Sequence, residues 1–263
     1  MGSKTAALPK KLQNAITERM RQSLLKGDTP FDKARLADAA SFVGALAADR
    51  TFGRSSMAIE SISDERRLTR IAIVNDDMPF IVDSVAATIA ALGLSIDRLV
   101  HPVIPVERDD KGKLIGIPDN DPDDAYWESM IYIEAARVDA KTRRQLQEGL
   151  KETLADVRAA VSDWPKLQQA MAQDADRIRD TDEEGADLLD WLNSGMLTQL
   201  GHVTRHRDGT QRDQLGICRK SARELLAEAS YERAFAWFAK KDNRRRPLII
   251  KANHLSNVHR RVP

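Results

Sequence analysis

The chain has 263 residues, which allows one large domain or two ordinary ones, and we expect two. Lys and Arg together number 41 against 40 Asp and Glu, so no global charge draws the chain to nucleic acid or to an anionic membrane. Cys218 is the only cysteine, which excludes an internal disulfide and a metal site made of cysteines alone. A reducing, cytoplasmic setting is therefore expected.

Two helices are predicted before residue 50. Apolar residues recur at helical spacing at Leu12, Ile16, Met20 and Leu24, and the stretch "KGDTPFD" then supplies a turn. The start of the chain lacks the apolar centre of a secretory signal, and no apolar run is long enough to span a membrane. We therefore expect residues 1–50 to form an N-terminal helical segment, and we expect no membrane partner.

A strand, a turn and a helix follow. "SSMAIESIS" (residues 55–63) is a short extended segment. "LTRIAIVND" (residues 68–76) has the strongest strand pattern in the chain, because β-branched residues crowd before a turn. Over residues 79–92 the apolar period becomes that of a helix, and Gly93 stands where such a helix ends.

Two more strand patterns and a long helix complete this part of the chain. "LSIDRLVHPVIPVER" (residues 94–108) is extended, but its prolines cannot donate to a ladder, so it is predicted to be an edge strand. "WESMIYIEAAR" (residues 127–137) alternates as a half-buried strand does. A helix with leucines and valines along one side is then expected over residues 139–164.

The order strand, helix, strand, strand, helix is typical of a ferredoxin-like unit, an α+β fold whose antiparallel sheet carries two helices on one face. We place it at residues 51–172. No extended segment after the long helix supplies the fourth strand. Because only the short polar turn "DERR" separates the two, residues 55–63 are predicted to pair antiparallel with residues 68–76 instead. The free edge of that early segment would then allow two copies to dimerise.

A second unit is predicted after a charged stretch without apolar period, residues 174–184, which we interpret as a domain boundary. Residues 185–263 are interpreted as the start of a second, incomplete α+β unit of PAS-like type. Its expected elements are a helix over residues 186–201, extended pieces at 202–206 and 215–218, a helix over 222–241 and a strand at 247–252.

The sequence carries no motif of a common catalytic or cofactor site. A dinucleotide enzyme needs a glycine-rich turn between strand and helix, but the turn here is "NDDMPF". The phosphate-loop, zinc-protease and serine-hydrolase motifs are also absent. We therefore expect no catalysis and no cofactor in this chain alone.

Metal and nucleic-acid sites are also disfavoured. "DNDPDD" imitates an EF-hand loop but lacks its glycine and has Met130 where the bidentate Glu belongs, so a solvated loop is predicted. His202 and His206 on a strand would lie about 13 Å apart, too far to share an ion. The basic run "KKDNRRRP" has no interleaved aromatic residues and is interpreted as a solvated helix end rather than a nucleic-acid site.

The seam between the first strand and the helix after it, "NDDMPFIVDSV" (residues 75–85), is the best candidate for a site. Pro79 is favoured in a first helical turn, and a preceding Asp accepts free N–H groups, so helix capping accounts for Asp77. Capping does not account for the second acid or for the polar residues one turn later. A histidine beside Pro102 is either a structural imidazole, bonded to a neighbouring strand or loop, or a polar ligand contact. The candidate ligand-binding residues are Asp76, Asp77, Phe80, Asp83, Ser84 and His101.

Two stretches, "VNDDMPFIVDSV" and "VHPVIPVERDDKGKL", resemble the N-terminal ACT-type regulatory region of the large bacterial NAD-dependent glutamate dehydrogenases. "DVRAAVSDW", "LLDWLNSGMLTQLG" and "NVHRR" extend the resemblance from about residue 50 to the end of the chain. It implies a non-catalytic regulatory or assembly portion of an enzyme that deaminates L-glutamate oxidatively to 2-oxoglutarate with NAD. The implied partners are the rest of the dehydrogenase chain, further copies in a homo-oligomer, and an amino-acid effector.

The resemblance has two departures. ACT domains bind amino acids where the turn after the first strand meets a helix, often through Asp-x-Pro-Gly, but here Phe80 replaces the glycine and is expected to fill the ligand's space. Family members are several times longer and hold a catalytic domain that this chain lacks. The alternatives are a stand-alone amino-acid sensor, with Asp76, Asp77 and Ser84 on the ligand's ammonium group, and a nucleic-acid binder acting through the "RRR" run.

Overall fold

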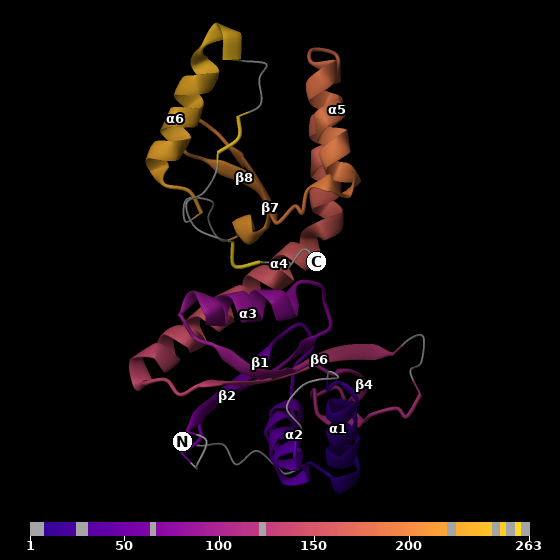
Figure 1. Ribbon diagram of the computed structural model, residues 1–263. Coiled ribbons are helices and arrows are strands. Elements are labelled where there is room, and N and C mark those ends of the chain that lie inside the picture. Colours follow the sequence, from indigo (N-terminus) through magenta and orange to yellow (C-terminus); the bar gives the residue numbers. More distant parts are fainter. Residues whose placement is uncertain are drawn as a thin grey trace. The chain divides into compact units, whose positions relative to one another are not determined.

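The computed structural model describes residues 8–24, 31–63, 67–120, 125–219, 225–243, 248–250 and 256–258. They form two compact units, Met1–Lys151 and Glu152–Pro263. The first unit contains α1 (Lys10–Gln22), α2 (Lys33–Ala47), β1 (Ser56–Ser61), β2 (Leu68–Asp76), α3 (Ile81–Ala91), β3 (Ile96–Val100), β4 (Val103–Arg108), β5 (Leu114–Gly116), β6 (Tyr126–Ala136) and the start of α4 (Ala140–Arg179) (Figure 1).

The sheet of the first unit is antiparallel throughout, in the order β1-β2-β6-β4-β5, with β3 also paired to β6. β1 lies against β2 in continuous register, from Ser56 opposite Val74 to Ser61 opposite Thr69. The segment before the first strand therefore takes the position of the fourth strand, as the sequence predicts. Residues 165–179, which follow in the sequence, belong to α4 instead.

The predicted single edge strand is in fact two strands that share one partner. β3 and β4 both pair with β6, and the chain bends between them at His101 and Pro102. The amide of Met130 donates to the carbonyl of Pro102 at the bend (3.0 Å). Beyond Glu107, β4 is paired on its outer side with β5, so only part of the predicted segment lies at an edge.

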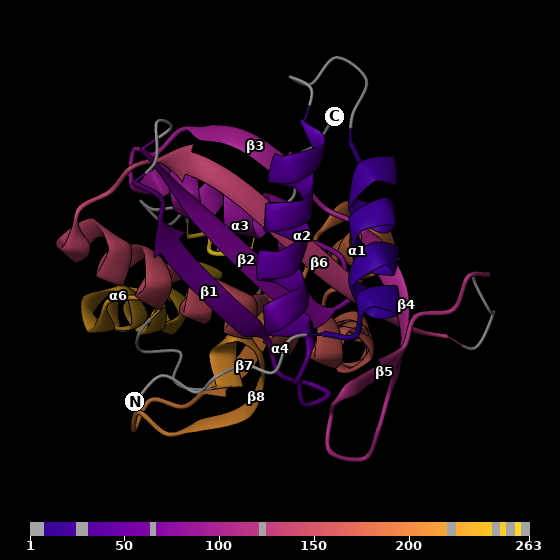
Figure 2. The ribbon, with the colours of Figure 1, turned by 90° about the horizontal axis from the view of Figure 1, so that it is seen from below.

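Helices cover both faces of this sheet. In Figures 1 and 2, α1 and α2 lie on one face, while α3 and the first turns of α4 lie on the other. Met130 and Tyr132 of β6 pack in the cluster with α1 and α2, and the alternate residues Ile131 and Ile133 are equally buried on the opposite face. The prediction of two helices on one face is confirmed. The prediction of a half-buried β6 is wrong, because α1 and α2 cover its second face.

A buried ion cluster joins the end of α2 to three strands. Asp76 of β2 and Glu128 of β6 lie opposite each other, and Nη2 of Arg50 donates to both carboxylates, at 2.8 and 2.7 Å. Arg108 of β4 adds two bonds to Glu128, from Nε (2.6 Å) and Nη2 (2.8 Å). Two cations therefore balance two anions, and the side chains of Arg50 and Glu128 have no exposed surface. Such a cluster is compatible with burial only because its charges and donors are paired.

The hairpin after β4 explains the Arg-Asp-x-x-Gly-x-Leu motif in physical terms. Oδ1 of Asp109 accepts from the amides of Lys111 and Lys113, which closes the turn. Gly112 has φ +85°, and a Cβ there would lie 2.5 Å from the carbonyl oxygen of Arg50. Its own carbonyl accepts from the Arg50 amide (3.0 Å) and from Nη1 of Arg108 (2.7 Å). Glycine is required because this turn holds the buried ion cluster against the end of α2.

The second unit contains the rest of α4, followed by α5 (Glu183–Trp191), a π-helical turn (Leu192–Met196), β7 (Gly201–Arg205), β8 (Gln211–Gly216), a 3-10 turn (Ile217–Arg219), α6 (Glu228–Ala239) and a second 3-10 turn (Lys241–Asn243). The helix, hairpin and helix predicted here are confirmed. Residues 248–250 form no strand, and the remainder of the predicted strand at 247–252 lies outside the described residues. The units divide within α4 rather than at residues 174–184, and the limits 51–172 and 185–263 stay predictions.

Asp163 fixes the β7–β8 hairpin to α4 within the second unit. Its carboxylate, only 1% exposed, accepts two bonds from Arg219, both at 2.5 Å, and one from the amide of Gly216 at 2.8 Å. The hydrogen bond from Arg219 lowers the pKa of Asp163. The end of β8 is therefore tied to the helix by a charge that stays ionised at neutral pH.

Glu128→Gln should lower the free energy of unfolding by about 3–5 kcal/mol, because it leaves two buried arginines without their shared anion. Urea denaturation followed by circular dichroism measures the loss. Glu60→Gln is the matched control, since Glu60 pairs with Arg70 but is 53% exposed, and it should cost less than about 1 kcal/mol. Equal losses in the two variants would contradict a special role for the buried cluster.

Candidate functional site

The turn between β2 and α3 differs from the predicted cap. α3 begins at Ile81, and its N-cap residue is Phe80, with φ +70° and no side-chain capping bond. Three residues separate Asp77 from the first helical residue, so its carboxylate is not placed as a cap, which must reach the second or third helical amide. The prediction that Asp77 caps this helix is wrong.

Asp77 instead begins a chain of polar side chains. The hydroxyl of Ser129, in β6, donates to Oδ1 of Asp77 (2.6 Å), and Nε2 of His101 lies 3.0 Å from the same hydroxyl oxygen. Because a carboxylate can only accept, the hydroxyl hydrogen points at Asp77, and His101 must donate through Nε2–H. The prediction of a structural imidazole bonded to a neighbouring strand is confirmed, and a neutral ring in this tautomer keeps a lone pair on Nδ1.

The charge state of His101 follows from its surroundings. Burial lowers the pKa of His101, while the negative charge of Asp77 opposes that shift. Burial is the larger effect, so the imidazole is neutral at pH 7. A neutral His101 beside an exposed Asp77 carboxylate presents hydrogen-bond acceptors rather than donors.

The structure brings only part of the predicted site together. Asp77 and His101 meet through Ser129, but Asp76 points to the opposite face of the sheet and is bound by Arg50. Asp83 and Phe80 are half-buried, and Ser84 is completely buried on α3. Sequence patterns gave no signal for Ser129, because it lies 52 residues from Asp77 in an ordinary strand pattern.

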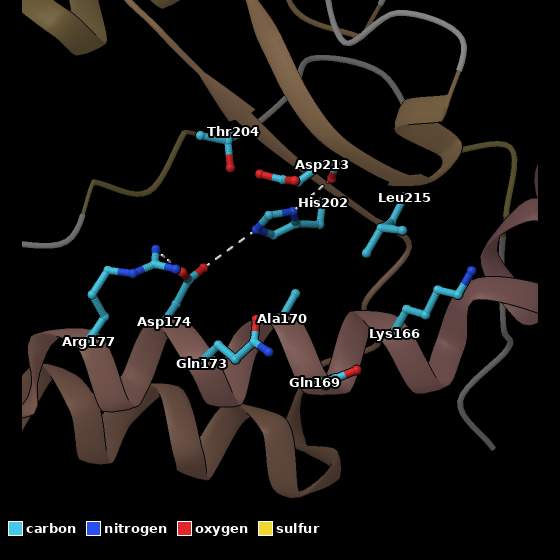
Figure 3. A pocket seen from close by; sticks show the side chains of 10 residues that line it. All are labelled: Lys166, Gln169, Ala170, Gln173, Asp174, Arg177, His202, Thr204, Asp213 and Leu215. Carbon is cyan, nitrogen blue, oxygen red and sulfur yellow. Dashed lines mark hydrogen bonds and ion pairs between the residues drawn. The ribbon is translucent and has the colours of Figure 1, made fainter.

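A second candidate is a pocket of about 300 Å³ in the second unit, between α4 and the β7–β8 hairpin (Figure 3). At its centre, Nδ1 of His202 lies 3.0 Å from the carbonyl oxygen of Asp213, and Nε2 lies 3.5 Å from the Asp174 carboxylate. Nη1 of Arg177 donates to the other oxygen of that carboxylate (2.7 Å). A neutral His202 with Nδ1–H would turn a lone pair toward Asp174, so this contact favours the imidazolium.

Metal binding has no geometric support in the described residues, where no three His, Cys, Asp or Glu side chains gather to hold an ion. Residues 121–124, most of the acidic EF-hand-like loop, lie outside the described ranges. His202 lies in β7, as predicted, and His206 follows the end of that strand. No helix within the described ranges has the length and apolar character needed to cross a membrane.

Comparison with known proteins identifies the first unit. Residues 32–150 match the family described as glutamate dehydrogenase, ACT1 domain. These residues form a glutamate dehydrogenase ACT1 domain. An NAD-specific glutamate dehydrogenase of Halomonas elongata is 33% identical over 172 residues, which cover 57% of this chain and 11% of the relative. That of Pseudomonas aeruginosa is 28% identical over 218 residues, covering 73% and 13% respectively. The chain thus spans roughly a tenth of the length of these relatives.

The ACT1 domain contains the whole side-chain chain of Asp77, Ser129 and His101. Its matched region begins at residue 32, so it includes α2, which the sequence alone places in a separate N-terminal segment. It also includes Arg50, Glu128 and the Gly112 hairpin. The pocket around His202 lies outside the ACT1 match.

The imidazole of His101 should titrate below 6.5, its ordinary value, because burial in the ACT1 domain disfavours the charged ring. The unfolded chain then binds more protons just below that value. Stability is therefore complete above pH 6.5 and falls as the pH drops toward the lowered pKa. NMR titration of the imidazole measures the midpoint. Asp77→Asn should lower it further, and a midpoint above 6.5 would contradict the burial argument.

Proposed function

We propose that this chain is a regulatory and assembly portion of an NAD-dependent glutamate dehydrogenase, without catalytic activity of its own. The ACT1 match over residues 32–150 carries the proposal, and the two relatives support it by name. The turn after β2 contains Pro79 and Phe80 rather than glycines, so it does not offer a backbone cradle for a pyrophosphate. NAD and glutamate are accordingly handled by other parts of the whole enzyme, to which this portion is joined.

The assembly role rests on the edge of the sheet. β1 is the terminal strand, paired on one side with β2. Two copies related by a two-fold axis can place their β1 strands side by side, which continues the ladder and needs no other partner. Sedimentation velocity at a series of concentrations tests this: reversible dimers are expected, and a monomer at every concentration would count against it.

The purified chain should form no NADH from glutamate and NAD. Absorbance at the NADH band, followed at several protein concentrations, measures the reaction. Formation of NADH in proportion to the concentration of the chain would overturn the non-catalytic assignment. The full-length enzyme that carries this portion, assayed in parallel, is the positive control.

A second candidate function, amino-acid sensing, is favoured by the acceptors at Asp77 and His101. The second carboxylate oxygen of Asp77 and Nδ1 of His101 have no hydrogen-bond partner among the described residues. An ammonium group is a donor with a positive charge, so it complements this pair of acceptors. Asp76 contributes less to such a site than the sequence suggests, because Arg50 already neutralises it.

Amino-acid binding is tested by thermal melts of the full chain with glutamate and a panel of other amino acids. Asp77→Asn and His101→Gln should remove any stabilisation by a bound amino acid, since each removes one acceptor. Asp97→Asn is the matched control, because Asp97 is an exposed acid on β3 away from the turn. No shift with any amino acid would reject sensing at this turn and leave the assembly role untouched.

A further inference from the structure

A cavity with an excess of positive charge lies at the end of the sheet opposite Asp77. Its volume is about 630 Å³, and its lining residues all belong to the first unit. They come from the end of β1, the residue before β2 and the connection from β6 into α4: Ser61, Arg67, Arg137, Val138, Asp139, Ala140 and Arg143. Leu68 pairs with Ala136 at this end of the strands, whereas Asp76 pairs with Glu128 at the other end.

Three arginines give this cavity its charge. Arg67, Arg137 and Arg143 are exposed and have no acidic partner among the described residues. Arg70, which lies on β2 close to Arg67 in sequence, is by contrast bound by Asp38 and Glu60. The guanidinium groups around the cavity are therefore available for an anion from solution.

Asp139 is the one acid in the lining, and it is already engaged. Its carboxylate accepts from the amide of Thr142 (2.7 Å) at the start of α4, and the backbone bond to Thr142 lowers the pKa of Asp139. Three cations against one anion leave the lining with an excess of two positive charges. The first turn of α4 is thus occupied by its own cap, and the arginines rather than the helix end provide the attraction.

We propose that this cavity binds a small molecule through a dianionic phosphate group. A phosphate monoester carries close to two negative charges at neutral pH, which matches the excess charge of the lining. The planar guanidinium offers paired N–H groups that fit phosphate oxygens, and three arginines approaching from different segments can hold more than one oxygen. The volume exceeds that of a phosphate group alone, so the site has room for the organic part of such a ligand.

Unlike-charged neighbours are missing for a physical reason that supports a ligand. Three guanidinium groups around one cavity repel one another, and this repulsion is relieved when a dianion enters. Binding therefore gains from charge compensation as well as from hydrogen bonds. The same reasoning predicts weakening by salt, because the arginines are exposed and screened by ions.

The test is a titration of the full chain with inorganic phosphate, at constant ionic strength set with potassium chloride. NMR signals of the arginine Nε–H groups report the position, and the shifts give a dissociation constant. Arg137→Gln and Arg143→Gln should each weaken phosphate binding by about tenfold, the effect of losing one charge-assisted pair. Circular dichroism and denaturation confirm that each variant is folded.

Arg144→Gln is the matched control. Arg144 is the next residue on the same helix, is equally exposed and does not line the cavity. It should bind phosphate as the unaltered chain does. Equal weakening by Arg144→Gln would show general attraction to a basic surface and overturn the site. Absence of shifts at the three arginines would do the same, and succinate binding as tightly as phosphate would overturn the assignment to phosphate.

Discussion

Glu128 is the acceptor on which the first unit depends. It is completely buried in β6, where Arg50 and Arg108 both donate to it, and Arg50 carries the same contact on to Asp76. Each arginine also reaches a backbone carbonyl, of Arg54 and of Gly112 respectively. The exit from α2, the β4–β5 hairpin and the register of β2 on β6 are therefore fixed by one set of charges, because none of these charges tolerates burial alone.

This ion cluster also determines the geometry of the candidate site. Arg50 holds the carboxylate of Asp76 on the face of the sheet covered by α1 and α2. Since side chains alternate along the chain as the strand ends, Asp77 turns to the other face. Ser129 follows Glu128 in β6 and alternates in the same way, so it meets Asp77 at hydrogen-bond distance. The polar chain through Ser129 to His101 is thus a consequence of where Glu128 lies.

Periodicity and turn chemistry were sufficient to predict the element order of the first unit from its sequence. The placement of residues 55–63 as the fourth strand succeeded because a hairpin-length turn leaves few other partners. The interactions of Glu128 were not predictable in this way, because Arg50 lies 78 residues from it and charged residues have no period of their own. The predicted end of the long helix at residue 164 was also wrong. α4 continues through Pro165, where one backbone bond is lost but the surrounding helix persists.

The rigidity of the sheet limits where a regulatory change in this unit can take place. A slip of β2 on β6 would move every buried side chain to the wrong face and separate the ion cluster, so the strands themselves are a poor switch. The two segments at the strand ends are different. Phe80 holds a left-handed backbone conformation, which costs about 1–3 kcal/mol for a bulky residue and is released if the turn rearranges. At the opposite end, the arginine cavity touches the first turn of α4, the helix that both units share. A ligand shifts an equilibrium only through contacts that differ between states, and these two ends are where such differences can arise without breaking the core.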